Sequence, residues 1–356
     1  MEAGGLRLCV FAFLCPPMAS HKKFSLEDGA MSSVQKFLSE KGLDLPLEPS
    51  DIQEDWSLPF MRWVVQHTTS GMECQFQEDD PPGIRISTHR DIVCDPALYN
   101  LARVEAGRPT THIVLGSNLA RLDWVKALMQ ANKAIFIDRS LAGRAAMSQQ
   151  LKLSRHIADI IQGGGHVWIA QAPGRTKDGI DQTHHGLLRM LALAWGGEEQ
   201  GPAALKGLLR PLVIRYDVNP CDGLLIREKV TGEKTKRDDE ISMRTGLEGW
   251  KGKVRIAEAP TVSTDVSGDR DGWLQLAAAV DKSILTLGVS GQWAASAASA
   301  IQTGNWTPLP DNMHHRAEQV IQQLSTHLGD MDRETLMRHL CEVYREGAPK
   351  VALTQN

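Results

Sequence analysis

The sequence of 356 residues lacks the long hydrophobic runs that membrane-spanning helices require. Its longest early apolar run, Leu8–Leu14, has seven residues, whereas a spanning helix needs about 18. Positive charge is not in excess either, because 39 Lys and Arg residues face 43 Asp and Glu residues and the net charge is -4. This balance argues against nucleic acid as a partner. With 42% hydrophobic residues, the composition is that of a globular protein and not of a disordered chain.

Cysteine motifs for metal binding are also absent. The six cysteines include no CxxC pair and form no cysteine–histidine pattern with zinc spacing. We therefore expect buried or unreactive thiols in a reducing compartment, and no bound metal. Tyrosine is scarce, with three residues against nine tryptophans, and two of the tryptophans, Trp56 and Trp63, lie close together.

The sequence divides into four stretches of different character. The first is expected to be unstructured, or a mis-assigned extension with Met18 or Met31 as the true start. A helical lead-in, an α/β domain and a helical C-terminal extension follow. The four stretches are residues 1–30, 31–82, 83–262 and 263–356. Residues 227–251 are charged and contain glycine, which we interpret as a mobile surface excursion.

Short apolar runs alternate with helical stretches from residue 84 onward. The runs are Ile84–Thr88, Thr111–Gly116, Lys133–Arg139, His166–Gln171, Leu209–Asp217 and Lys253–Ala259. Helical periodicity is found near residues 95–106, 122–131, 142–162, 183–196, 272–288, 312–328 and 332–346, and Leu274–Ile301 is interpreted as buried helix. This alternation predicts an α/β fold with a mostly parallel central sheet flanked by helices, and with helical N- and C-terminal extensions.

A histidine and two aspartates follow the first of these strands. The segment reads His89-Arg90-Asp91-Ile92-Val93-Cys94-Asp95. A histidine at a strand end can act as a general base when a carboxylate orients its ring, and either Asp95 or Asp91 could do so. The alternative is a local helix cap without catalytic function.

Three cations follow other predicted strands. Arg139 ends one strand, and a second strand leads into Gly174-Arg175-Thr176-Lys177. Parallel α/β sheets place their sites beyond the carboxyl ends of the strands. Arg139, Arg175 and Lys177 at that edge would suit a phosphate, since Arg offers paired donors and Lys a point charge.

These segments, in this order, resemble the four sequence blocks of the glycerolipid acyltransferases. The blocks are the His89…Asp95 segment, the strand ending in Arg139, Gly174-Arg175, and Pro211-Leu212-Val213-Ile214. The first block is most similar to bacterial members of the family whose block reads His-Arg-Asp-Ile-Val-x-Asp. The turn from Gly174 to Gly179 and the segment Tyr216–Asp222 resemble the same members.

The resemblance implies roles for single residues. His89 would be the general base and Asp95, or else Asp91, its carboxylate partner. Arg139, Arg175 and Lys177 would bind the phosphate of the acceptor, with Gly174 allowing close backbone approach. No cofactor is implied beyond the co-substrate, acyl-CoA or an acyl-carrier protein. Two positions depart from the family pattern: Cys94 stands where the family has its Asp, and Pro173 replaces a Glu.

The implied function is acyl transfer from a thioester to a phosphorylated glycerol in phospholipid synthesis. Lysophosphatidate is the first choice of acceptor and glycerol 3-phosphate the second. The alternatives are a non-catalytic lipid-binding protein and an acyl-thioester hydrolase. We expect a cytoplasmic protein bound peripherally to the inner face of the cell membrane. Trp56–Val65 is either its docking surface or a helix packed in the core.

Overall fold

A computed structural model describes residues 6–10, 35, 36, 38–43, 51, 53–120, 126, 129–235, 237–263, 266, 270–328 and 332–346. Within these ranges eight strands form one sheet in the order β1-β2-β8-β7-β3-β6-β4-β5. The strands are β1 Leu6–Val10, β2 Gly71–Gln77, β3 Gly83–Ser87, β4 His112–Gly116, β5 Ala134–Ile137, β6 His166–Ala170, β7 Leu209–Tyr216 and β8 Lys253–Glu258.

The sheet is mostly parallel, as the sequence predicts. Strands β7, β3, β6, β4 and β5 all run parallel to one another, and β2 runs parallel to β8. The two antiparallel pairs are β1 with β2 and β7 with β8. Ser87 at the end of β3 is opposite Ala170 of β6 on one side and Leu212 of β7 on the other. The loops that follow β3 and β6 therefore leave the same edge of the sheet side by side.

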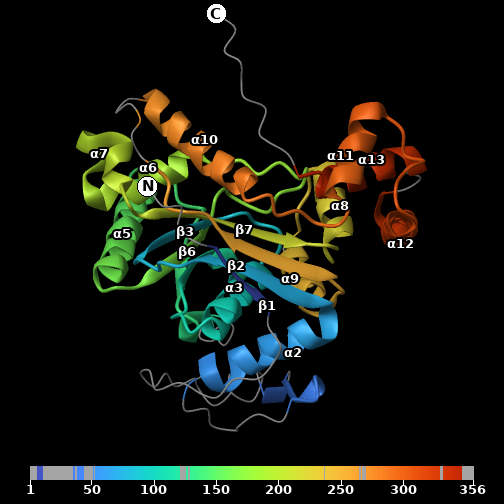
Figure 1. The fold of residues 1–356 in the computed structure, drawn as a ribbon, viewed down its shortest axis with the longest axis horizontal. Helices are drawn as coiled ribbons and strands as arrows, with labels where there is room; N and C mark the ends of the chain where they lie inside the picture. Colours follow the sequence, from blue (N-terminus) through green and yellow to red (C-terminus); the bar gives the residue numbers. More distant parts are fainter. Residues whose placement is uncertain are drawn as a thin grey trace, which may run out of the picture.

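Helices cover both faces of the sheet (Figure 1). They are α2 Leu58–Thr68, α3 Cys94–Glu105, α5 Gly143–Gln162, α6 His185–Ala192, α7 Gly197–Gln200, α8 Asp222–Thr231, α9 Asp238–Glu248, α10 Arg270–Thr286, α11 Ala294–Thr303, α12 Asp311–Leu328 and α13 Arg333–Tyr344. Helices α8, α11, α12 and α13 share a separate hydrophobic cluster beside the sheet, shown at the right of Figure 1. None of the helices in these ranges has the length and apolar character that crossing a bilayer requires.

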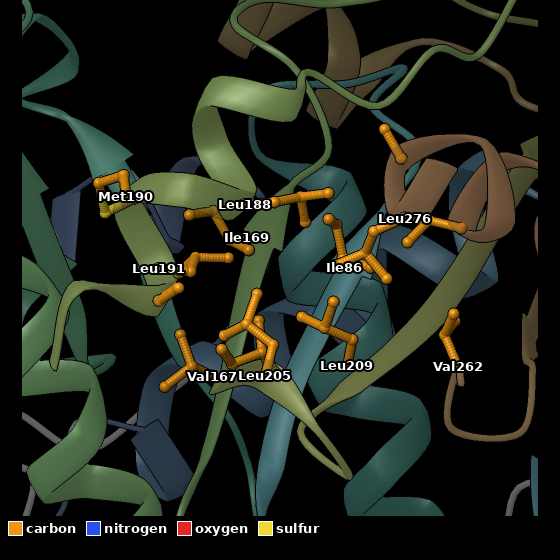
Figure 2. Close-up of a cluster of buried hydrophobic side chains, with 14 of the residues drawn as sticks. Ile86, Val167, Ile169, Leu188, Met190, Leu191, Leu205, Leu209, Val262 and Leu276 are labelled. Carbon is orange, nitrogen blue, oxygen red and sulfur yellow. The ribbon is translucent and has the colours of Figure 1, made fainter. Parts of the chain in front are cut away.

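The larger core lies between the sheet and helices α5, α6 and α10. Ile84 and Ile86 of β3 point to this side, as do Val167 and Ile169 of β6, because alternate residues of a strand face the same way. Figure 2 shows Ile86, Val167 and Ile169 in one cluster with Leu188, Met190 and Leu191 of α6, Leu205 and Leu209, and Leu276 of α10.

The opposite face is covered by α2 and α3, and it decides between the two interpretations of Trp56–Val65. Trp56 is 1% exposed, and Met61, Val64 and Val65 are also buried. Trp63 is partly buried, with its ring stacked between Phe60 and His67. The structure supports the core interpretation, and this segment is not a free docking surface.

Several expected boundaries are wrong. Residues 6–10, expected to be unstructured, form β1, because alternating Leu-Arg-Leu-Cys-Val can pair with the open edge of β2. The stretch 227–251 is not an excursion, since α8 and α9 account for most of it. The expected single buried helix over 274–301 is two helices, α10 and α11, separated by residues 287–293. The other residues of 1–34 lie outside the described residues, as does most of 122–128.

Candidate active site

His89 lies just beyond the carboxyl end of β3 and binds Asp95. Its Nδ1 is 2.9 Å from Asp95 Oδ2, and the side chains are 17% and 0% exposed. Because a carboxylate only accepts hydrogen bonds, Nδ1 carries a proton, and in the neutral ring Nε2 has the lone pair. In the described residues nothing binds Nε2, so it is available to a ligand.

Asp95 is held by three further donors. Its Oδ2 accepts from the backbone N–H groups of Arg90, at 2.6 Å, and Asp91, at 3.0 Å. Its Oδ1 accepts from the Tyr216 hydroxyl at 2.8 Å. Burial, followed by the charge of Asp95, raises the pKa of Tyr216 well above its usual value, so this hydroxyl stays a donor. These bonds fix the carboxylate that orients His89.

Asp91 binds backbone groups at the start of α3 and not His89. Its Oδ1 accepts from the N–H groups of Val93 and Cys94, at 2.9 and 2.7 Å, and so satisfies the first turn of α3. The sequence left the partner of His89 open, and in the structure it is Asp95. The thiol of Cys94, the residue that stands where the family pattern has Asp, donates to Gly246 O at 3.3 Å.

The turn after β6 lies against the histidine loop. Thr176 N donates to His89 O at 2.9 Å. Gly174 has φ of 83°, a conformation that side-chain-bearing residues rarely adopt. Arg175 Nη2 donates to Ser242 Oγ of α9 at 3.1 Å, while its Nη1 is buried without a hydrogen-bond partner. Arg175 thus lies beside the His89 loop, held by a helix that the sequence did not predict.

The other two cations do not join Arg175. Lys177 Nζ is bound to Glu228 of α8 at 2.8 Å. Arg139 is exposed, and a Cβ at Gly116 would lie 3.7 Å from its Nε. Strand β5 is three positions from β3 in the sheet, which places the two chain segments roughly 14 Å apart. The predicted convergence of three cations is therefore not observed.

A buried ionic cluster of Asp181, Arg90 and Arg215 stabilises the loop that carries His89. Asp181 accepts two hydrogen bonds from Arg90, at 2.6 and 2.8 Å, and one from Arg215 at 2.7 Å. Burial raises the pKa of Asp181, but Arg215 and Arg90 outweigh it and lower the value to about 2. Arg215 also pairs with Glu346 at 3.1 Å. Asp181 stays ionised at neutral pH and fixes the segment next to His89.

The end of α13 closes against the same turn. Arg345 Nε donates to Asp178 O at 3.1 Å. Gly179 has φ of 70°, and a Cβ there would lie 2.5 Å from Arg345 O and 2.7 Å from Glu342 O. Only glycine fits this contact, which joins the C-terminal helices to the loop that carries Arg175.

Sequence reasoning missed several of these contacts. Tyr216 was noted only as part of a shared segment, and the roles of Asp181, Arg215, Ser242 and Glu346 carry no local signal because their partners are far apart in the chain. The described residues contain no group of three or more His, Cys, Asp or Glu side chains that could hold a metal ion.

Comparison with known proteins bears on this constellation. Residues 66–197 match the family model described as Acyltransferase. Among solved structures, the chain is similar to the 1-acyl-sn-glycerophosphate (LPA) acyltransferase PlsC from Thermotoga maritima, with 10% sequence identity and a TM-score of 0.41 over 74% of this chain and 95% of that chain. No curated protein matches the sequence.

The range that matches the acyltransferase family model, residues 66–197, covers more than a third of the chain. His89, Asp95, Arg139 and Arg175 all fall inside the matched range, whereas Tyr216 and α9 fall outside it. The family match agrees with the resemblance of the sequence blocks to glycerolipid acyltransferases.

Proposed function

We propose that this protein transfers a fatty acyl group from an acyl thioester to a hydroxyl of a phosphorylated glycerol. The observation that carries the proposal is the His89–Asp95 pair at the end of β3, with Nε2 unoccupied and the pair inside the acyltransferase match. Lysophosphatidate is the preferred acceptor and glycerol 3-phosphate the second. The donor is acyl-CoA or an acyl-carrier protein.

His89 Nε2 takes the proton from the acceptor hydroxyl as its oxygen attacks the thioester carbonyl carbon. The carbon–sulfur bond then breaks, and the proton on His89 passes to the departing sulfur. Asp95 holds Nδ1–H and stabilises the imidazolium between these two steps, as carboxylates do in catalytic triads. No covalent bond between enzyme and acyl group is needed.

Arg175 is the proposed ligand of the acceptor phosphate nearest to His89. Arg139 is the second, because it is exposed and a long side chain can span part of the gap to β3. Lys177 contributes only if its pairing with Glu228 opens. The Pro173 position, where the family has Glu, is exposed and offers no side-chain charge. The acceptor is thus bound by fewer charged groups than the sequence suggested.

The test is a transfer assay with the full chain, a radiolabelled acyl donor and each acceptor in turn. We expect labelled phosphatidate from lysophosphatidate, at a higher rate than labelled lysophosphatidate from glycerol 3-phosphate. Both acyl-CoA and acyl-carrier protein are supplied as donors. Label found only in free fatty acid would indicate a hydrolase, and label left in the donor with both acceptors would indicate a non-catalytic protein; either result overturns the proposal.

A further inference from the structure

One stretch of the surface has an unusual charge pattern. Between residues 139 and 158 the sequence holds four Lys or Arg residues and no Asp or Glu, although the whole chain has a net charge of -4. The four are Arg139, Arg144, Lys152 and Arg155, and all are exposed. In the part of the chain that the structure describes, none of them has an ion-pair partner.

Two exposed apolar side chains lie within the same stretch. Met147 is 67% exposed and Leu141 is 39% exposed. Met147 follows Arg144 by three positions on α5, so the two side chains are neighbours on the helix surface. Lys152 and Arg155 continue the exposed side of α5, while Leu153 and Ile157 face the core.

The position of this stretch relative to the sheet is informative. Helix α5 follows β5 after the short segment 138–142, and β5 runs parallel to β3 through β4 and β6. The first turn of α5 therefore lies at the same edge of the sheet as His89. A flat partner that touched Leu141 and Met147 would face the edge where Nε2 is unoccupied.

We propose that Arg139, Leu141, Arg144, Met147, Lys152 and Arg155, here called the α5 surface, dock the protein on an anionic lipid bilayer. Basic side chains are attracted by anionic headgroups, while exposed Leu and Met enter the boundary between headgroups and acyl chains. This pairing of unneutralised cations with apolar side chains favours a lipid surface.

A second exposed apolar surface provides the contrast. Val230 of α8 is 42% exposed and Ile241 of α9 is 45% exposed. Four cations around them are neutralised within the protein, in the pairs Arg227–Asp238, Lys229–Glu342, Lys234–Asp239 and Arg244–Glu248. Among the described residues Arg237 is exposed there without an ion pair, so that surface offers less free positive charge to a bilayer than Arg139, Arg144, Lys152 and Arg155 do.

The test is co-sedimentation of the full chain with vesicles, without any acyl donor. The vesicles are equimolar phosphatidylcholine and phosphatidylglycerol, or phosphatidylcholine alone. We expect binding to the anionic vesicles that weakens as salt is added. Reversing three charges in Arg144→Glu/Lys152→Glu/Arg155→Glu should lower partitioning at least about 50-fold, since each basic residue near an anionic surface contributes about five-fold.

A matched control changes the net charge equally elsewhere. Arg244, Arg333 and Arg338 are exposed on α9 and α13, and their triple replacement by Glu should change partitioning by less than about five-fold. Likewise Leu141→Ser/Met147→Ser should weaken binding, whereas Leu274→Ser/Leu285→Ser on α10 should not. Thermal melting confirms that each variant is folded.

Equal losses from the α5 and control variants, or no loss from either, would overturn the inference. The inference goes beyond the proposed function, and the two fail separately. Vesicle binding that depends on the α5 surface in a protein without transfer activity would refute only the proposed function. Transfer activity together with vesicle binding that is unchanged by the α5 charge reversals would refute only the docking surface.

Discussion

The sheet carries a buried ionic cluster at each edge, and the two clusters use the same kinds of residues. At the carboxyl edge, His89 and Tyr216 both bind the buried carboxylate of Asp95. At the amino edge, the Tyr99 hydroxyl donates to the buried carboxylate of Glu258, and His166 lies beside it. The arginines of the amino-edge cluster are Arg85, Arg103, Arg108 and Arg210.

The two histidines differ in whether a ring nitrogen remains without a hydrogen-bond partner among the described residues. His166 is 3% exposed, with Nδ1 2.6 Å from Arg85 Nη1 and Nε2 3.5 Å from Asp80. Burial, and then the charge of Arg85, lower the pKa of His166 to about 3, so it is neutral at physiological pH. His89 is 17% exposed and keeps Nε2 unbound. A buried ionic cluster therefore predicts chemistry only where one member retains an accessible, unused atom.

The largest expected effect separates these histidines. His89→Gln should lower kcat about 1000-fold, because the general base is lost, with little change in melting temperature. His166→Gln should lower the melting temperature and leave kcat nearly unchanged. Acyl-transfer kinetics and thermal melts of both variants measure this difference. Full activity in His89→Gln would refute the proposed mechanism.

The next effect concerns the amino-edge carboxylate. Glu258→Gln removes a buried carboxylate, so that three of the arginines share Asp80 alone and the fourth keeps only Asp79. It should lower the free energy of unfolding by about 3 kcal/mol. Denaturant unfolding measures the loss, and kcat well below the melting temperature should be unchanged. Glu73→Gln on the exposed side of β2 serves as the control. A large fall in kcat at full stability would mean that the amino-edge cluster also serves the reaction.

The two tyrosines give a smaller contrast. Tyr216→Phe removes one hydrogen bond from Asp95 and should lower kcat about ten-fold while KM for the donor stays constant. Tyr99→Phe removes the corresponding bond from Glu258 and should change stability alone. A fall in kcat of equal size in both variants would show that the two clusters are not separate in function.

The smallest expected effect involves Asp281, which lies near Asp181. In the part of the chain that the structure describes, its carboxyl group has no cation as a partner. Burial, and to a lesser extent Asp181, raise the pKa of Asp281 from 3.8 to about 6, although two bonds from Thr183 oppose the shift. The unfolded chain ionises first, so stability falls as pH rises from about 4 to 6 and stays lower above that range.

Asp281→Asn keeps an acceptor for Thr183 and removes the charge. It should therefore raise the free energy of unfolding by about 1 kcal/mol at pH 8 and by almost nothing at pH 4. Thermal melts across this pH range test the sign. A gain that is the same at both pH values would point to packing and not to charge.

The sequence predicted the parts of the molecule that depend on neighbouring residues. Apolar runs such as Ile84–Thr88 predicted most of the sheet, and the His89 segment predicted the main candidate residue. The missed parts depend on distant partners. Strand β2, with its polar Glu73 and Gln75, has no clear apolar run. Helix α9 was missed because its charged sequence was interpreted as a surface excursion, and its contact with Arg175 forms only in the folded chain.

The fate of Lys177 illustrates the same limit. Its place after β6 was correct, but its partner Glu228 lies 51 positions away and cannot be inferred from spacing. The partner of His89 was ambiguous for a different reason. Asp91 and Asp95 are both within reach in sequence, and only the start of α3 at Cys94 decides which of them turns toward the ring.

The contact between Gly179 and the end of α13 has a consequence for the order in which the protein is completed. Synthesis proceeds from the N-terminus, and domains begin to fold as they emerge. All eight strands precede residue 259, whereas Glu342, Arg345 and Glu346 follow all of them in the chain. The nascent sheet can thus assemble while the turn beside His89 still lacks its final contacts. The turn beside His89 therefore gains these contacts only after every strand of the sheet has been synthesised.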